Sequence, residues 1–169
     1  ERYSRIKIEV QEQEDQEQKQ KSQQLRVTLV EPELRKDIPA PLLNNDNATI
    51  VCNSFDEKFA NDHLNLLENA SLLVGLHPDQ ATEAIVDVAL SLGIPFAVVP
   101  CCVFPKLFPQ RRLTSGQRVK NCGGFLRYLR AKHVDIETAL LDFEGKNRVL
   151  YWKGGEKVLK CETCKKVDD

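Results

Sequence analysis

The sequence predicts an α/β fold with a doubly wound, mainly parallel sheet that closes in an antiparallel hairpin at its C-terminal end. From residue 25 onward, short apolar runs alternate with segments of helical spacing. The runs are nearly continuous in apolar residues, as in parallel strands that are buried on both faces. Near the end, two apolar runs flank the turn sequence Glu144-Gly145-Lys146-Asn147, which is typical of a β-hairpin.

Length and charge limit the classes of function. The chain has 169 residues, enough for one domain with a core, and its net charge of −1 argues against a generally basic nucleic-acid-binding surface. No apolar run approaches the roughly 20 residues of a membrane-spanning helix, and no signal peptide is visible. Several of the six cysteines fall in or beside apolar runs, which indicates reduced thiols. We therefore expect an intracellular protein without a membrane span.

The chain divides into three parts by composition. Residues 1–24 form a polar tether or insertion, because residues 11–24 read QEQEDQEQKQKSQQ and contain no apolar side chain. Residues 25–153 form the α/β domain, and residues 154–169 form a charged tail that carries the pair Cys161 and Cys164.

The expected elements follow in order through the domain. Gly93 stands where a helix C-cap glycine belongs, directly after the second helix. The expected strands are 26–30, 48–52, 71–74, 96–99, 136–143 and 148–152, and the expected helices are 56–69, 82–92 and 126–132.

This order of elements resembles the class I S-adenosylmethionine-dependent methyltransferases, in which the last strand of a doubly wound, Rossmann-like sheet is an antiparallel insertion. The likeness covers residues 25–153, with the first four runs as the family's second to fifth strands. The resemblance implies S-adenosylmethionine as cofactor. It implies that Glu31, after the first run, holds the ribose hydroxyls. Asp56, beside Phe55, would face the adenine, although Asp56 is equally well placed to cap the helix that follows.

The stretch Gly75-Leu76-His77-Pro78-Asp79 lies where the family's substrate-facing motif lies, so Gly75 is expected to border the cofactor. It departs from the Asp-Pro-Pro-Tyr and Asn-Pro-Pro-Tyr motifs of the amino-methylating enzymes. With the double cysteine after the next strand, it is more similar to the group that includes tRNA 2′-O-methyltransferases. We interpret Asp79 mainly as a cap of the helix that follows.

The family's first strand and Gly-rich loop have no counterpart in residues 1–24, which contain no glycine, and the chain contains no methionine. We therefore expect the C-terminal portion of a methyltransferase or a degenerate member of the family. The alternative function is a non-catalytic binding or scaffold module with the same fold.

Three residues are the candidates for chemistry at the strand ends: His77, Cys101 and Cys102. Because the carboxyl ends of parallel strands share one edge, His77 and Cys101 should face one crevice. His77 suits a general base, since histidine titrates near neutral pH. The cysteines are open to several interpretations: apolar filler, a Pro-Cys nucleophile as in enzymes that methylate pyrimidine C5, a metal site with Cys161 and Cys164, or a polarisable pocket wall. We favour the pocket wall and expect no metal.

The densest basic segment, residues 104–120, directly follows the cysteine pair. Lys106, Arg111 and Arg112 are the candidate contacts to RNA, with Phe104 and Phe108 available to stack on bases. RNA is therefore the expected substrate.

Overall fold

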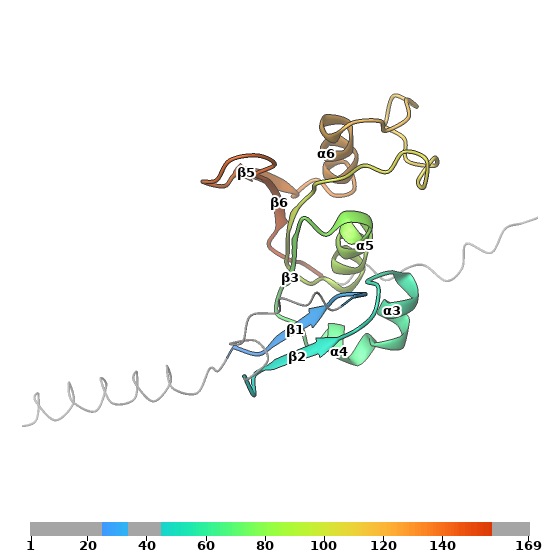
Figure 1. Cartoon of the computed structure of the whole chain (residues 1–169). Helices are drawn as coiled ribbons and strands as arrows, with labels where there is room; N and C mark the ends of the chain where they lie inside the picture. The colour runs from blue at the N-terminus through green and yellow to red at the C-terminus, as the bar shows by residue number, and fades with distance from the viewer. Residues whose placement is uncertain (1–24, 34–44, 157–169) are drawn as a thin grey trace, which may run out of the picture. The chain divides into compact units, whose positions relative to one another are not determined.

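The computed structural model describes residues 25–33 and 45–156, which fall into two compact units divided between Asn53 and Ser54 (Figure 1). The predictions for residues 1–24 and for the pair Cys161 and Cys164 lie outside the described residues. In the described part of the chain, no helix is both long enough and apolar enough to cross a membrane.

The first unit holds a two-stranded parallel sheet. Strand β1 (Val27–Val30) pairs with β2 (Ala48–Val51), with Val27 opposite Ala48. Both strands are short runs rich in β-branched residues, which fit a pleated backbone. The two strands predicted at 26–30 and 48–52 are confirmed.

The second unit is built on a mixed sheet with the strand order β3-β4-β6-β5. Strands β3 (Leu73–Leu76) and β4 (Phe96–Val99) are parallel, whereas β6 (Arg148–Trp152) is antiparallel to β4 and to β5 (Glu137–Leu140). The predicted hairpin is therefore present. As the resemblance implied, the last strand of the described residues lies between β4 and the strand that precedes it.

Helix α5 (Thr82–Leu92) connects β3 to β4 and follows a short 3-10 helix, η1 (Asp79–Ala81). It ends at Gly93, whose φ of 73° is the left-handed conformation predicted for a C-cap glycine. Helix α6 (Cys122–Arg130) begins four residues before the helix predicted at 126–132. It begins early because the Asn121 side chain caps it by accepting a hydrogen bond from the Gly124 N–H.

The helix predicted at 56–69 is two shorter helices, α3 (Glu57–Asp62) and α4 (Leu64–Glu68). The break lies at His63, whose φ of −120° and ψ of 32° are not helical. The prediction of one continuous helix is therefore wrong.

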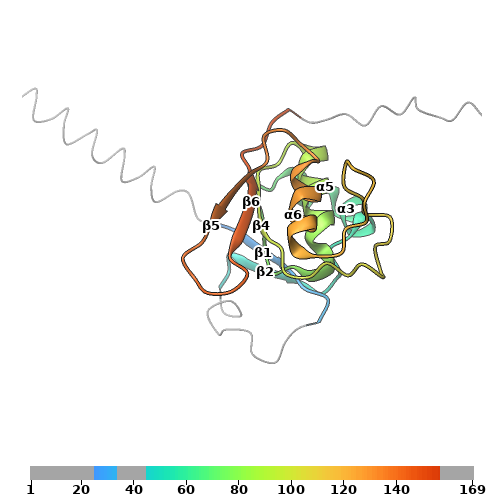
Figure 2. The same cartoon turned by 90° about the horizontal axis from the view of Figure 1, so that it is seen from above.

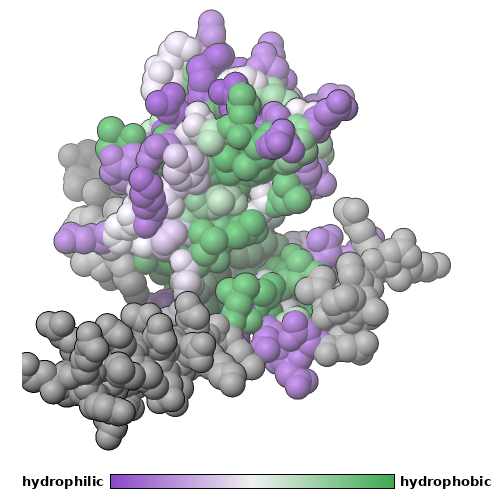
Figure 3. Space-filling view, turned by 90° about the vertical axis from the view of Figure 1, so that its left-hand side faces the viewer, coloured by the Kyte–Doolittle hydropathy of each residue, from purple (hydrophilic) through white to green (hydrophobic). Residues whose placement is uncertain are grey.

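Helices α5 and α6 cover one face of the sheet, as Figure 2 shows from above. Their side chains Val86, Phe125 and Leu129 form one buried cluster with Phe96 and Val98 of β4. Alternation along β3 turns Val74 and Leu76 to the opposite face, where they are 66% and 65% exposed. Apolar side chains gather on this helix-free side in Figure 3. The mixed α/β class is confirmed, but the described helices of this unit do not cover both faces.

Candidate functional site

The candidate site begins where the chain leaves β3. His77 and Asp79 have positive φ values of 52° and 46°. Such values are uncommon for residues other than glycine and gather at functional sites. The His77 N–H donates to the Val99 carbonyl at 3.1 Å, and its ring lies edge-on to Phe143 with 6.4 Å between centroids. His77 and Asp79 are therefore held at the rim of the sheet, with both side chains exposed.

The end of β4 supplies the two cysteines. Cys101 is buried, and its thiol donates a hydrogen bond to Oδ1 of Asp79 at 2.9 Å. Cys102 is half-buried, and its sulfur, the Cys101 sulfur and a carboxylate oxygen of Asp79 lie within 4.8 Å of one another. The carbonyl of Cys101 accepts hydrogen bonds from Nζ of Lys146 and from the Cys122 thiol. The two strand ends therefore meet through Asp79 and Cys101, whereas the contacts of His77 are with Val99 and Phe143.

The protonation of Cys101 limits its chemistry. Burial and the hydrogen bond to the Asp79 carboxylate raise the pKa of Cys101 to about 12. The group is therefore a neutral thiol at physiological pH, whereas a nucleophile requires the thiolate. This protonation state argues against the interpretation of Cys101 as a Pro-Cys nucleophile.

A cavity of about 220 Å³ adjoins Cys101. Its walls include apolar side chains of α6 and the polar turn between β5 and β6. Among the lining residues are Cys101, Cys122, Phe125, Leu126, Lys146 and Asn147. An apolar wall with a few convergent polar groups is typical of small-molecule and base-binding sites. The position of Cys101 agrees with the pocket-wall interpretation of this residue.

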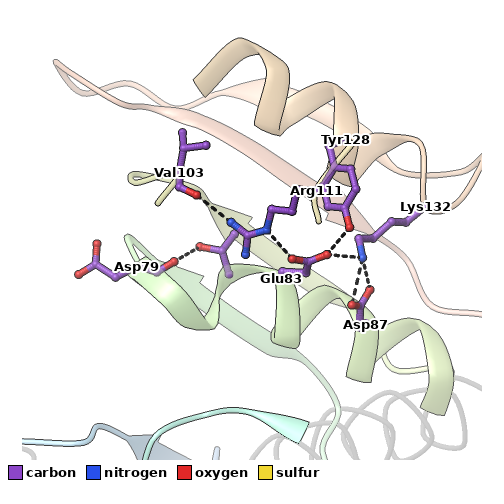
Figure 4. A network of polar contacts seen from close by, with 8 residues as sticks. Asp79, Glu83, Asp87, Val103, Arg111, Tyr128 and Lys132 are labelled. Carbon is purple, nitrogen blue, oxygen red and sulfur yellow. Dashed lines mark hydrogen bonds and ion pairs between the residues drawn. The ribbon is translucent and has the colours of Figure 1, made fainter. Parts of the chain in front are cut away.

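Arg111 does not contact solvent and is not available to RNA. It is 2% exposed, and its Nε donates to Oε2 of Glu83 at 2.5 Å while its Nη1 donates to the Val103 carbonyl at 2.9 Å (Figure 4). Its guanidinium lies over the rings of Phe108 and Phe125. The expectation of an RNA contact at Arg111 is therefore wrong. Through its ion pair with Glu83, Arg111 holds the basic segment against α5.

The rest of the basic segment remains on the surface. Lys106 and Arg112 are exposed, and Arg112 forms a β-bridge with Arg118. A second hollow, of about 400 Å³, lies beside this segment, and its walls include Arg112, Arg127, Tyr128 and Lys132. Phe108 packs under Arg111, so it is not free to stack on a base as expected.

Three of the four positions expected to contact the cofactor have local structural roles. The Asp56 side chain caps α3 by accepting from the Phe59 N–H at 2.8 Å, and Phe55 packs against the buried cores. A Cβ at Gly75 would lie 2.9 Å from Ile85 Cδ1, so glycine there lets α5 approach β3. Glu31 is half-buried after β1 and lies in the first unit, whereas the other three positions lie in the second. The cofactor contacts expected from the resemblance therefore stay predictions.

Sequence reasoning missed three polar residues of this region. Asp79 was interpreted as a helix cap, but its side chain accepts from Cys101, and α5 has Ala81 at its N-cap position. Lys146 lies in a hairpin turn, where a single exposed lysine gives no sign of a site. Glu83, the partner of Arg111, lies in the first turn of α5, where an acidic residue is common and gives no sign of a buried ion pair. Of the three, only Asp79 could have been found from the sequence, since it lies at the strand edge that also holds His77.

No protein-family model, curated protein or solved structure matches the chain.

Proposed function

We propose that this chain belongs to an S-adenosylmethionine-dependent methyltransferase that modifies RNA inside the cell, and that its second unit provides the acceptor side of the active site. The observation that carries the proposal is the insertion of β6, antiparallel, between β4 and β5. An antiparallel last strand within an otherwise parallel, Rossmann-like sheet is the feature on which the family resemblance rests.

The position of the polar groups supports an acceptor site. In open α/β sheets, ligands bind outside the carboxyl ends of the parallel strands. That edge holds His77, Asp79 and Cys101, and the cavity of about 220 Å³ begins at Cys101. His77 is the candidate base for an acceptor hydroxyl, because it is exposed at the rim and histidine titrates near neutral pH. The Cys101 thiol donates a hydrogen bond to Asp79, and Cys101 forms part of the cavity wall.

Support for RNA comes from surface cations near α6. Arg112 and Arg127 line the hollow of about 400 Å³, and Lys106 is exposed on the same basic segment. Guanidinium groups can bind phosphates in a bidentate fashion and stack on bases. Arg111 has no part in this surface.

A methyl-transfer assay with labelled S-adenosylmethionine and total RNA tests the proposal. We expect His77→Ala to lower transfer by about 10²- to 10⁴-fold, the usual contribution of a general base. His133→Ala is the control, because His133 packs against Trp152 at the other end of β4. Equal loss in both variants would contradict a role for His77. Arg112→Glu with Arg127→Glu should weaken RNA binding, whereas Lys58→Glu on α3 should not.

The alternative is a non-catalytic RNA-binding module with the same fold. It is favoured by one observation: Asp56, Phe55 and Gly75 each have a local structural role that accounts for the residue without a cofactor. Calorimetric titration with S-adenosylhomocysteine separates the two functions. RNA binding without any binding of S-adenosylhomocysteine and without methyl transfer would establish the alternative.

A further inference from the structure

We propose that Asp79, Cys101 and Cys102 form a binding site for a zinc-class divalent metal ion. The three side chains come from two strand ends more than 20 residues apart in sequence, yet their donor atoms lie within 4.8 Å of one another. Two sulfurs and one carboxylate oxygen are ligands that Zn²⁺ accepts, and the sulfurs select against Mg²⁺ and Ca²⁺.

The spacing of the donor atoms is close to that of a bound site. Zinc–sulfur bonds of about 2.3 Å place two sulfurs of a tetrahedral site roughly 3.8 Å apart. The sulfurs and the carboxylate oxygen all lie within 4.8 Å of one another, so the more distant pairs would approach by about 1 Å. Cys101 Sγ and Asp79 Oδ1, now 2.9 Å apart, would separate slightly. Rotations of the three side chains, without a change of backbone, can supply such a movement.

The backbone explains how two adjacent cysteines can bind one ion. Successive side chains of a β-strand point to opposite faces, which would separate the two sulfurs. Strand β4 ends at Val99, however, and the chain from Pro100 onward is irregular, with Phe104 at a φ of 47°. The cysteines therefore follow the strand instead of lying within it, and both sulfurs reach Asp79.

The surroundings suit a metal with an open coordination position. Burial decreases from Cys101 through Cys102 to the exposed Asp79, which leaves a path from solvent. Nζ of Lys146 contacts the Cys101 carbonyl, so one positive charge lies beside the three anionic ligands that metal binding would create. Each thiol would release its proton to solvent on binding. Three protein ligands leave the fourth tetrahedral position for water or for a ligand in the adjoining cavity.

Cobalt(II) titration of the reduced protein tests this site, because thiolate ligands to cobalt give a near-ultraviolet charge-transfer band. We expect one ion per chain, with a band that zinc abolishes. Cys102→Ser and Asp79→Asn should each weaken cobalt binding by on the order of 100-fold or more. Asp79→Asn replaces an exposed carboxylate by an isosteric amide, so its fold can be verified by circular dichroism.

Two controls distinguish this site from other thiols. Cys122→Ser removes a thiol that also touches the Cys101 carbonyl, and the joint change of Cys161→Ser and Cys164→Ser removes the C-terminal pair. Both proteins should bind cobalt as the parent does. The proposal is overturned if the reduced parent gives no band, if Asp79→Asn binds with unchanged affinity, or if the C-terminal pair is required. Because cobalt binding is measured without RNA or methyl donor, the result is independent of the proposed methyl transfer.

Discussion

At the scale of single residues, the Glu83 carboxylate binds three side chains of the second unit. Its carboxylate accepts hydrogen bonds from Arg111 at 2.5 Å, Tyr128 at 2.5 Å and Lys132 at 2.8 Å. Burial alone would raise the pKa of Glu83, but the hydrogen bonds from Lys132, Tyr128 and Arg111 outweigh it and lower the pKa below its ordinary value. This cluster joins α5, the basic segment and α6.

Glu83→Gln should strongly destabilise the protein. Arg111 is 2% exposed, so loss of the carboxylate leaves a buried charge without its partner. Removal of one partner from a buried pair costs about 3–5 kcal/mol of unfolding free energy. Because Glu83 keeps some solvent contact, we expect a loss at the lower end, about 3 kcal/mol, in urea denaturation. Asp62→Asn, in an exposed pair with Lys58, is the control and should cause no resolvable change. A loss under about 1 kcal/mol in Glu83→Gln would show that the cluster is not a buried ion pair.

The same cluster predicts a pH dependence. A carboxyl group whose pKa is lower in the folded state stabilises the protein above its unfolded pKa, about 4.3 for glutamate. That stabilisation is lost as the pH falls through the still lower folded pKa. The difference in unfolding free energy between the parent protein and Glu83→Gln should therefore shrink between about pH 5 and about pH 2, measured by denaturation at each pH. A difference that stays constant with pH would contradict the lowered pKa of Glu83.

Two adjacent arginines show why the candidate site could be predicted only in part from the sequence. Arg111 and Arg112 are equivalent in the sequence, yet Arg111 is buried on Glu83 and Arg112 is exposed. Arginine is rarely buried without a partner, and the partner here lies 28 residues away. The meeting of the ends of β3 and β4 was predictable, because it follows from parallel strands. The choice of Asp79 as the partner of Cys101 was not, since it depends on the positive φ of Asp79.

At the scale of elements, α3 depends on its cap. The helix spans only six residues, too few to be stable alone, and Asp56 satisfies the N–H of Phe59 at its first turn. The side chain therefore serves local folding, whether or not it also faces a ligand.

Asp56→Ala should lower the unfolding free energy by about 1 kcal/mol, and Asp56→Ser should restore most of it, because serine also caps helices. Thermal or urea denaturation measures both. Glu57→Ala, one residue further on, keeps the cap and should be close to the parent. If Asp56→Ala leaves the unfolding free energy unchanged, the hydrogen bond from the Phe59 N–H to Asp56 does not stabilise α3.

Helices with strong boundary signals were predictable, and helices without them were not. The 82–92 helix was correct to the residue at both ends, because its apolar spacing and Gly93 agree. No glycine or proline marks the break at His63, so the helical spacing of apolar residues continues through it in the sequence. The start of α6 was missed because Gly123 and Gly124 disfavour helix, and the Asn121 cap overrides them.

At the scale of the whole molecule, β3 is the strand at the end of the described sheet of the second unit. Strand β3 pairs with β4 on one side, and β3 is the last strand in the order of the described sheet. Val74 and Leu76 project from it with 66% and 65% exposure. An apolar edge strand without charges or proline favours pairing with other chains, although β3 spans only four residues.

Charges on this strand should therefore reduce self-association. Val74→Lys places a charge at an exposed position, so we expect the unfolding temperature to change little while light scattering at high concentration falls. Val98→Lys, on the buried face of β4 with 0% exposure, is the opposite case and should not fold. Unchanged scattering by folded Val74→Lys would show that the edge of β3 does not associate.

The spacing of residues alone did not give the strand order, whereas the resemblance to the methyltransferases implied the antiparallel insertion of the last strand, which the described sheet contains. The hairpin of β5 and β6 follows from its turn, but the choice of which of the two meets β4 depends on pairing across about 50 residues. In sequence, β5 (ETAL) is shorter and less apolar than β6 (RVLYW). Only β6 presents three buried side chains, Val149, Leu150 and Trp152, and this difference emerges from packing.

The insertion of β6 has a consequence for biosynthesis. A ribosome delivers β3, α5 and β4 first, then α6 and β5, and only at the end the strand that lies between β4 and β5. Until Trp152 has emerged, β5 has no neighbour to join and the inner edge of β4 stays open. This unit therefore completes its fold only after nearly all of it has been translated, with the open edge of β4 available to chaperones in the interval.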